Sequence, residues 1–135
     1  MVPLAERGPI AALMVREADK AGLFAAGYGL SDLDACDCLA LLRHQGEEKR
    51  LMALAFLQDS NRPETALLFF AWIRPGTEKD GRELFVETVD EWAIEHGFKR
   101  IVAYTRLPAK HIARWEQRYG FTRTGLVEIA RTVGE

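Results

Sequence analysis

Charged residues cluster around a glycine at positions 78–83 (EKDGRE), between an apolar run and an amphipathic segment. The preceding run at 65–74 (TALLFFAWIR) is long, apolar and rich in aromatic side chains, as is typical of a buried strand. Pro75 and Gly76 then break it, and a helix is expected to follow. Free backbone N–H groups at a helix start commonly hold a phosphate, so this strand–turn–helix predicts a site for a phosphate-bearing molecule.

The side chains of this turn conflict with that chemistry, because Glu78, Asp80 and Glu83 place three carboxylates where an anion would lie. A helix N-terminus carries about half a positive charge, which nearby carboxylates neutralise. Two unit charges about 4 Å apart interact by roughly 4 kcal/mol at an effective dielectric constant near 20. Their repulsion could therefore offset several hydrogen bonds to a phosphate. The alternative is that Thr77 and Asp80 form a capping box and the other charges are solvated.

Composition predicts a single globular domain covering residues 1–135. Hydrophobic residues make up 48% and charged residues 28%, as in an ordinary globular protein. The formal net charge of −2 gives no long-range attraction for nucleic acid or anionic lipid. No apolar run approaches the roughly 20 residues that span a bilayer, and the first residues show no signal-peptide pattern. We therefore expect folding in a cytoplasm, with neither nucleic acid nor membrane as a partner.

Cysteine and histidine spacing predicts no metal site. Cys36 and Cys38 form a C-x-C pair, and His44, His96 and His111 lie at no recognisable metal-ligand spacing. We expect two reduced thiols that pack in or near the core. None of the three histidines is paired with an evident second catalytic residue, although His96 falls on the apolar face near a helix end.

Hydrophobic periodicity and turn residues predict the helices and strands around this turn. In chain order we expect a short strand at 2–4, a helix at 9–21, a short helix from Ser31, strands at 39–44, 51–58 and 65–74, a helix at 77–96, a strand at 100–104, a helix at 108–118 and a strand within 124–133. The order β-α-α-β-β-β-α-β-α-β predicts an α/β mixed sheet with helices packed on its faces.

This order and several local motifs resemble the GNAT (N-acetyltransferase) fold. The resemblance rests on 73–75 (IRP) at the end of a central strand, the following loop and helix, and 119–121 (YGF) after a helix. In the first half, the segments IAALMVREAD from Ile10, AG from Ala26 and LDAC from Leu33 are similar to GNAT-like proteins of tailed bacteriophages. Some of those proteins are acetyltransferases and others are small internal virion proteins.

The resemblance implies a degenerate cofactor loop. In active family members the loop reads Q/R-x-x-G-x-G/A, and its backbone N–H groups hold the pyrophosphate of acetyl-CoA. Aligned through 73–75, this sequence has Glu78 for the Gln or Arg, Gly81 for the first glycine and Glu83 for the second. The side chain of Glu83 is expected to fill the space that a glycine leaves.

The resemblance also implies that the usual general acid is missing. Active members commonly use a tyrosine to protonate the departing thiolate, and here that position holds Glu116, beside Trp115. Burial could let a glutamate carry that proton, but a solvated helix residue is the alternative. Tyr119 and Tyr104 are candidates in a shifted alignment, and Tyr119 otherwise packs half-buried against the sheet.

We therefore expect a non-catalytic GNAT-like protein that is a structural or packaged component of a phage particle. It would be made in the bacterial cytoplasm, contact other virion proteins or copies of itself, and use no cofactor. The alternative is an acetyl-CoA-dependent N-acetyltransferase, in which N–H groups around Gly81 hold the pyrophosphate and Glu116 or a water handles the proton. A third interpretation is a host-directed regulatory protein that binds a bacterial target.

Overall fold

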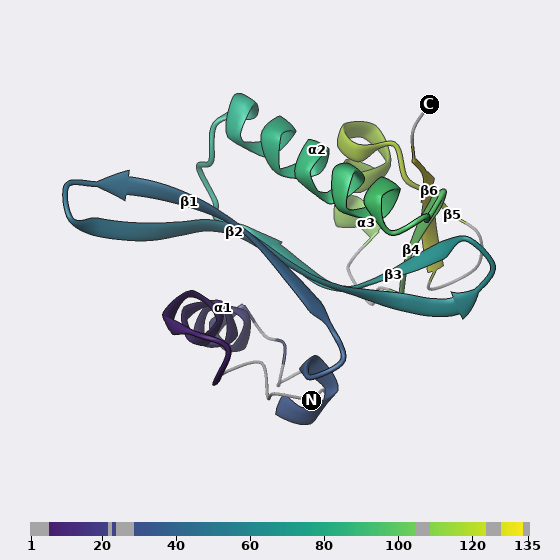
Figure 1. Ribbon diagram of the computed structural model, residues 1–135. Coiled ribbons are helices and arrows are strands. Elements are labelled where there is room, and N and C mark those ends of the chain that lie inside the picture. Colours follow the sequence, from purple (N-terminus) through teal and green to yellow (C-terminus); the bar gives the residue numbers. More distant parts are fainter. Residues whose placement is uncertain (1–5, 22, 24–28, 105–108, 124–127, 134–135) are drawn as a thin grey trace.

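The computed structural model describes residues 6–21, 23, 29–104, 109–123 and 128–133. A six-stranded sheet with strand order β1-β2-β3-β4-β6-β5 carries helices on both faces (Figure 1). The elements are α1 (Pro9–Lys20), a 3₁₀ helix (Leu30–Leu33), β1 (Asp37–Gln45), β2 (Glu48–Arg62), β3 (Thr65–Ile73), α2 (Lys79–Glu95), β4 (Arg100–Tyr104), α3 (Ala109–Tyr119), β5 (Thr122–Arg123) and β6 (Glu128–Thr132).

The helices divide the buried side chains into two clusters, because α1 covers one face of the sheet and α2 and α3 cover the other (Figure 1). Strand β2 contributes to both clusters, since successive side chains point to opposite faces. Ala53, Ala55 and Leu57 pack on the α2 side, whereas Leu54 and Phe56 pack on the α1 side. Burial on both faces explains the continuous apolar run in this strand.

Strands β3 and β4 run parallel and diverge after their first residues. They pair only from Thr65↔Arg100 to Leu67↔Val102. From Leu68 onward the described neighbour of β3 is β2 alone, while β4 pairs with β6 along its whole length. Toward its C-terminal end β3 therefore has an edge with no described strand beside it, and such an edge offers peptide N–H and C=O groups to a ligand.

Strands β1 and β2 form a long hairpin with a β-bulge. Leu41 and Leu42 pair with Ala53 and Leu51, which leaves Met52 as the extra residue on β2. Beyond the bulge the hairpin extends past the first turn of α2 (Figure 1).

The predicted fold class, a mixed sheet with packed helices, is confirmed. The predicted strand at 2–4 lies outside the described residues. The strand expected at 51–58 runs from Glu48 to Arg62, because the polar residues at both of its ends continue to pair.

Two smaller predictions need correction. The helix expected from Ser31 is a single 3₁₀ turn that begins one residue earlier; its N-cap is Gly29, whose N–H donates to Asp32 Oδ2 at 2.7 Å. The strand expected within 124–133 is preceded by a further two-residue strand, β5, which pairs with β6.

Candidate functional site

The turn between β3 and α2 is held in place by Arg74. Its backbone N–H donates to the carbonyl of Met52 at the bulge (2.7 Å), and its Nε donates to the carbonyl of Leu51 (2.9 Å). The carbonyl of Arg74 accepts from both the N–H (3.1 Å) and the hydroxyl (2.7 Å) of Thr77. The guanidinium lies 5.0 Å from the ring centroid of Trp72. These contacts fix the position at which α2 begins.

The predicted capping box of Thr77 and Asp80 is wrong. The N-cap of α2 is Glu78, whose side chain makes no capping hydrogen bond. Thr77 is instead buried, and its hydroxyl donates to the carbonyl three residues back in the turn. The N–H groups of the first turn of a helix have no intrahelical acceptor. Those of Lys79, Asp80 and Gly81 are therefore available to a ligand.

Gly81 lies where the start of α2 comes closest to the sheet. A Cβ built on it would stand 3.3 Å from Thr77 Cγ2 and 3.6 Å from Leu41 Cδ2. Any longer side chain here would push the helix start away from β1, so a glycine allows this close approach.

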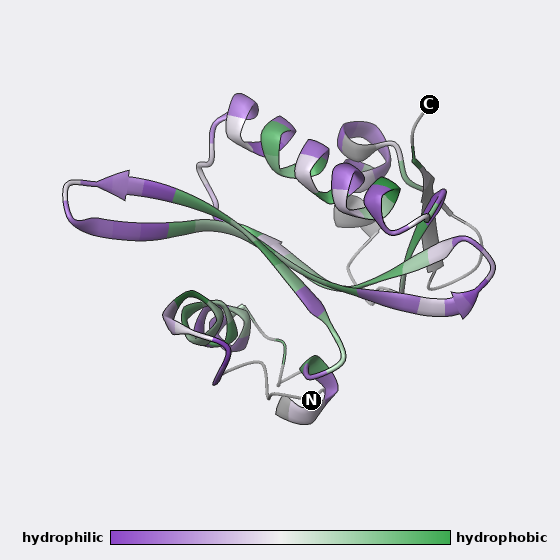
Figure 2. Cartoon of the chain, viewed as in Figure 1, coloured by the Kyte–Doolittle hydropathy of each residue, from purple (hydrophilic) through white to green (hydrophobic). Residues whose placement is uncertain are grey.

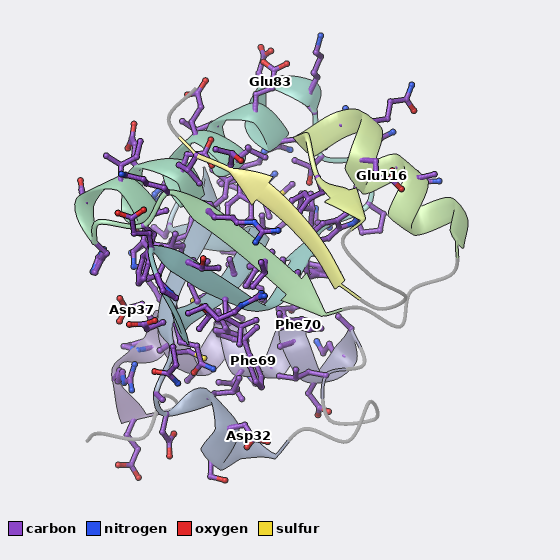
Figure 3. The ribbon with its side chains drawn as sticks, turned by 90° about the vertical axis from the view of Figure 1, so that its right-hand side faces the viewer. Asp32, Asp37, Phe69, Phe70, Glu83 and Glu116 are labelled. Atoms are coloured by element: carbon purple, nitrogen blue, oxygen red, sulfur yellow. The ribbon has the colours of Figure 1, made fainter. Side chains whose placement is uncertain are left out.

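The carboxylates of the turn lie on the protein surface. Glu78, Asp80 and Glu83 are all exposed, and Glu83 Oε1 lies 3.7 Å from Lys79 Nζ. Figure 3 shows Glu83 on the outer side of α2, so its side chain does not fill the turn as the resemblance implied. The Nη1 of Arg82 donates to the carbonyl of Thr77 (3.0 Å), which places a cation beneath the turn.

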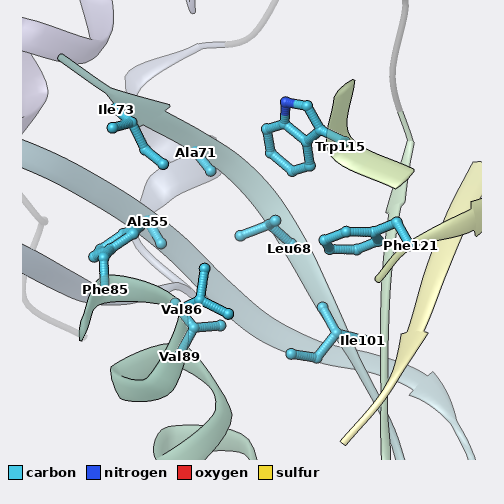
Figure 4. Close-up of a pocket in the computed structure, with 10 residues that line it drawn as sticks. All are labelled: Ala55, Leu68, Ala71, Ile73, Phe85, Val86, Val89, Ile101, Trp115 and Phe121. Atoms are coloured by element: carbon cyan, nitrogen blue, oxygen red, sulfur yellow. The ribbon is translucent and has the colours of Figure 1, made fainter. Parts of the chain in front are cut away.

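An apolar pocket lies between α2, α3 and the sheet (Figure 4). Its volume is about 40 Å³. The small side chains of Ala55 and Ala71 leave this space open, and the rings of Trp115 and Phe121 lie across it with centroids 5.5 Å apart. Every lining residue is apolar, so the pocket suits an uncharged apolar group: Ala55, Leu68, Ala71, Ile73, Phe85, Val86, Val89, Ile101, Trp115 and Phe121.

A second, polar groove runs between α2 and α3. Its volume is about 440 Å³. It begins at the first turn of α2 and carries both signs of charge: Lys79, Arg82, Glu83, Val86, Glu87, Asp90, Gln117 and Arg118. Sequence reasoning missed this groove and the apolar pocket, because both depend on where α3 lies beside α2.

Glu116 follows Trp115 on α3 and is partly exposed (Figure 3). It therefore lies next in sequence to a residue of the apolar pocket. Tyr119 ends α3 and Tyr104 ends β4, but their side chains lie outside the described part of the chain. The roles of all three stay predictions.

A polar cluster joins the other end of α2 to the start of β1. Trp92 Nε1 donates to Asp37 Oδ2 (2.9 Å), and the His96 ring stacks on Trp92 with centroids 4.7 Å apart. His96 Nδ1 donates to the Trp92 carbonyl (2.7 Å), and its Nε2 lies 3.6 Å from Asp37 Oδ2. Sequence reasoning placed His96 on the apolar face but missed Asp37, which is far away in the chain.

The cysteine prediction is confirmed, since both thiols are free, with Cys36 buried and Cys38 partly buried. Burial raises the pKa of the Cys36 thiol to about 11, and the Arg7 guanidinium opposes this shift. The pKa of Cys38 is also raised by burial.

Within the described ranges no group of three or more His, Cys, Asp or Glu residues could hold a metal ion. No helix of that part of the chain is long and apolar enough to cross a membrane.

Solved structures of acetyltransferases share this fold. Tetrahymena GCN5 superposes with a TM-score of 0.67 at 9% identity, covering 97% of this chain and 94% of its own. A protein assigned as an N-acetyltransferase from Lactobacillus plantarum gives 0.67 at 15% identity, covering 93% of both chains. A Bacillus subtilis acetyltransferase in complex with CoA gives 0.53 at 18% identity, covering 76% of this chain and 80% of its own. The chain therefore has the GNAT acetyltransferase fold.

Comparison at the level of sequence finds no such relative. No protein-family model matches this chain, and no curated protein matches it. The phage assignment stays a prediction.

Proposed function

We propose that this protein is an acyl-CoA-dependent N-acyltransferase that transfers a short acyl group to an amine. The observation that carries the proposal is the uncapped start of α2, fixed by Arg74 beside the separating strands β3 and β4. Solved proteins with the same fold include an acetyltransferase bound to CoA, which supports this choice.

The chain supplies complementary groups for each part of such a substrate. The free N–H groups of Lys79, Asp80 and Gly81, with the helix dipole, suit a pyrophosphate. The edge of β3 from Phe70 to Ile73, beside which the described residues place no further strand, suits an amide-bearing arm. The apolar pocket suits the acyl group.

The bound thioester would supply an activated acyl carbon. The amine nitrogen forms a bond to that carbon while the carbon–sulfur bond breaks, and the amine proton balances the charge on the thiolate. Positioning of the two reactants supplies much of the rate in such a transfer. Glu116 is the candidate for the proton, since the sequence resemblance aligns it with the general-acid position of active GNAT enzymes.

Coenzyme A titration tests the proposal. A ligand at 100 times its Kd raises the unfolding free energy by about 2.7 kcal/mol, which is readily seen as a thermal shift. We expect this shift in the wild type and its loss in Gly81→Glu, whose side chain would meet Thr77 and Leu41. Thr88→Ala, which removes a hydroxyl bonded within α2 (2.8 Å), is the matched control and should bind normally. No shift at about 1 mM coenzyme A would overturn the proposal.

A non-catalytic role in a phage particle is the second candidate. It is supported by the three exposed carboxylates around the start of α2 and by glutamate at the general-acid position. Mass spectrometry of purified particles tests it, since a virion component would occur there in stoichiometric amount.

A further inference from the structure

The tip of the β1–β2 hairpin places basic residues directly across from each other. Arg43 pairs in register with Arg50, and His44 pairs with Lys49. All four are exposed, and none forms an ion pair with an acidic residue of the described chain. The like charges of Arg43 and Arg50 destabilise this antiparallel pair. The hairpin projects past the helix layer, and its distal half is hydrophilic (Figures 1 and 2).

The outer face of α2 has the opposite character. Glu83, Glu87, Glu91 and Glu95 recur every four residues and are all exposed. Residues four apart are neighbours on a helix, and like charges there are destabilising. Only Glu83 of this series has an ion pair among the described residues, with Lys79.

Two apolar side chains lie within this acidic series. Large exposed apolar residues of the described chain are Ile10, Leu84 (53% exposed) and Ile94 (55% exposed). Leu84 is three residues before Glu87, and Ile94 is three residues after Glu91, so both share the acidic face. Apolar side chains within a polar surround are typical of a protein–protein interface.

We propose that the hairpin of one copy of this protein docks on the outer face of α2 of a second copy. A second copy of the chain is chosen because of charge complementarity: Arg43 and Arg50, which share one face of the hairpin, match a row of glutamates. Their aliphatic stems can cover Leu84 and Ile94. A twofold arrangement satisfies both contacts at once.

The docking cannot occur within one chain. Leu41 lies against the start of α2, and from there the hairpin runs away from the rest of the helix (Figure 1). Nucleic acid fits less well, because Glu47 and Glu48 lie at the hairpin tip and the whole chain has a net charge of −2.

Sedimentation and light scattering at several salt concentrations test the docking. We expect a dimer in dilute buffer whose Kd rises at least about tenfold between 0.05 and 0.5 M salt. The variants Arg43→Glu/Arg50→Glu and Glu87→Lys/Glu91→Lys should each weaken self-association at least about tenfold. Mixed in equal amounts, they should form a heterodimer, because each hairpin then meets an α2 of opposite charge.

The matched control is Arg16→Glu/Asp19→Lys, which reverses two exposed charges on α1 and should leave the dimer intact. Circular dichroism of each variant separates lost docking from lost folding. A wild type that is monomeric at about 0.5 mM in dilute buffer would overturn the proposal. So would heparin binding by a monomer that Arg43→Glu/Arg50→Glu abolishes, since the hairpin's occupant would then be a polyanion.

Discussion

The Nη2 of Arg74 lies 3.8 Å from Glu17 Oε2, and this ion pair connects α1 on one face of the sheet with the turn that starts α2 on the other. Both side chains are largely buried, with exposures of 22% and 15%. Arg74 also bonds to the carbonyl of Leu51 and packs on Trp72. The Arg74 guanidinium therefore links the helix on one face of the sheet to the turn that starts the helix on the other.

Replacement of Arg74 should reduce both stability and ligand binding. Arg74→Ala leaves the Leu51 carbonyl without its side-chain donor, so we expect about 1–3 kcal/mol lower unfolding free energy. Coenzyme A affinity should fall as well, because the turn loses its side-chain bond to β2 and is held by backbone bonds alone. Glu17→Gln serves as the control: it removes the ion pair but keeps the turn, so it should affect stability more than affinity. Denaturant unfolding and calorimetry measure the two quantities.

Neutralising the turn should tighten coenzyme A binding. In Glu78→Gln/Asp80→Asn/Glu83→Gln, three carboxylates no longer oppose the helix dipole or an incoming pyrophosphate. We expect roughly tenfold tighter binding at low ionic strength and a smaller gain at high salt. Glu91→Gln, further along the same helix, should bind like the wild type. Equal affinity for the triple variant and the wild type would contradict the electrostatic conflict inferred from the sequence.

Kinetics can distinguish a catalytic role of Glu116 from a role in substrate binding. If it transfers the proton, Glu116→Gln should lower kcat about 100-fold with little change in the Kd for coenzyme A. Glu116→Tyr places the residue typical of active family members at that position and should retain turnover. Equal kcat for all three proteins would exclude a role for this side chain.

The apolar pocket should select the acyl group. Ala71→Val adds two methyl groups to the wall of a cavity of about 40 Å³. We expect unchanged coenzyme A binding and slower acyl transfer, because the space beside the acyl carbon is filled. Thermal unfolding provides the control for folding, since two methyl groups too large for the cavity would strain the core and lower the Tm.

Stability should decrease at high pH through Cys36. Its thiol pKa is 9.0 when unperturbed and about 11 in the fold, raised by burial. The folded state therefore holds this proton more tightly than the unfolded chain. The resulting stabilisation is complete below pH 9 and is lost as the pH rises through 11. Denaturant unfolding from pH 7 to 11 should show a steeper decline in the wild type than in Cys36→Ala.

Much of the fold could be predicted from local sequence. The run at 65–74 forms a strand that ends at Ile73, and the helix expected at 77–96 spans Lys79–Glu95. Both could be predicted because hydrophobic periodicity and turn residues are local signals. Caps were less predictable. Thr77 and Asp80 fit a capping box by spacing, but the Arg74 carbonyl competes for the hydroxyl of Thr77.

The site required contacts between distant segments. Trp92 and Asp37 are bonded across 55 residues, and no local pattern marks that pair. The apolar pocket depends on Trp115 meeting Phe121 above β3, and the polar groove on α3 lying beside α2. Motif alignment identified Gly81 and Glu116 from the sequence, but the residues that lie around them are known only from the structure.

The bulge at Met52 determines which residues face each other at the hairpin tip. Because this extra residue has no partner on β1, Arg43 lies opposite Arg50. In an unbulged hairpin the register before the bulge would continue, and Leu51 would lie opposite Arg43 instead. One supernumerary residue thus brings the two arginines together across the strands, and its carbonyl accepts from the backbone N–H of Arg74 at the turn before α2.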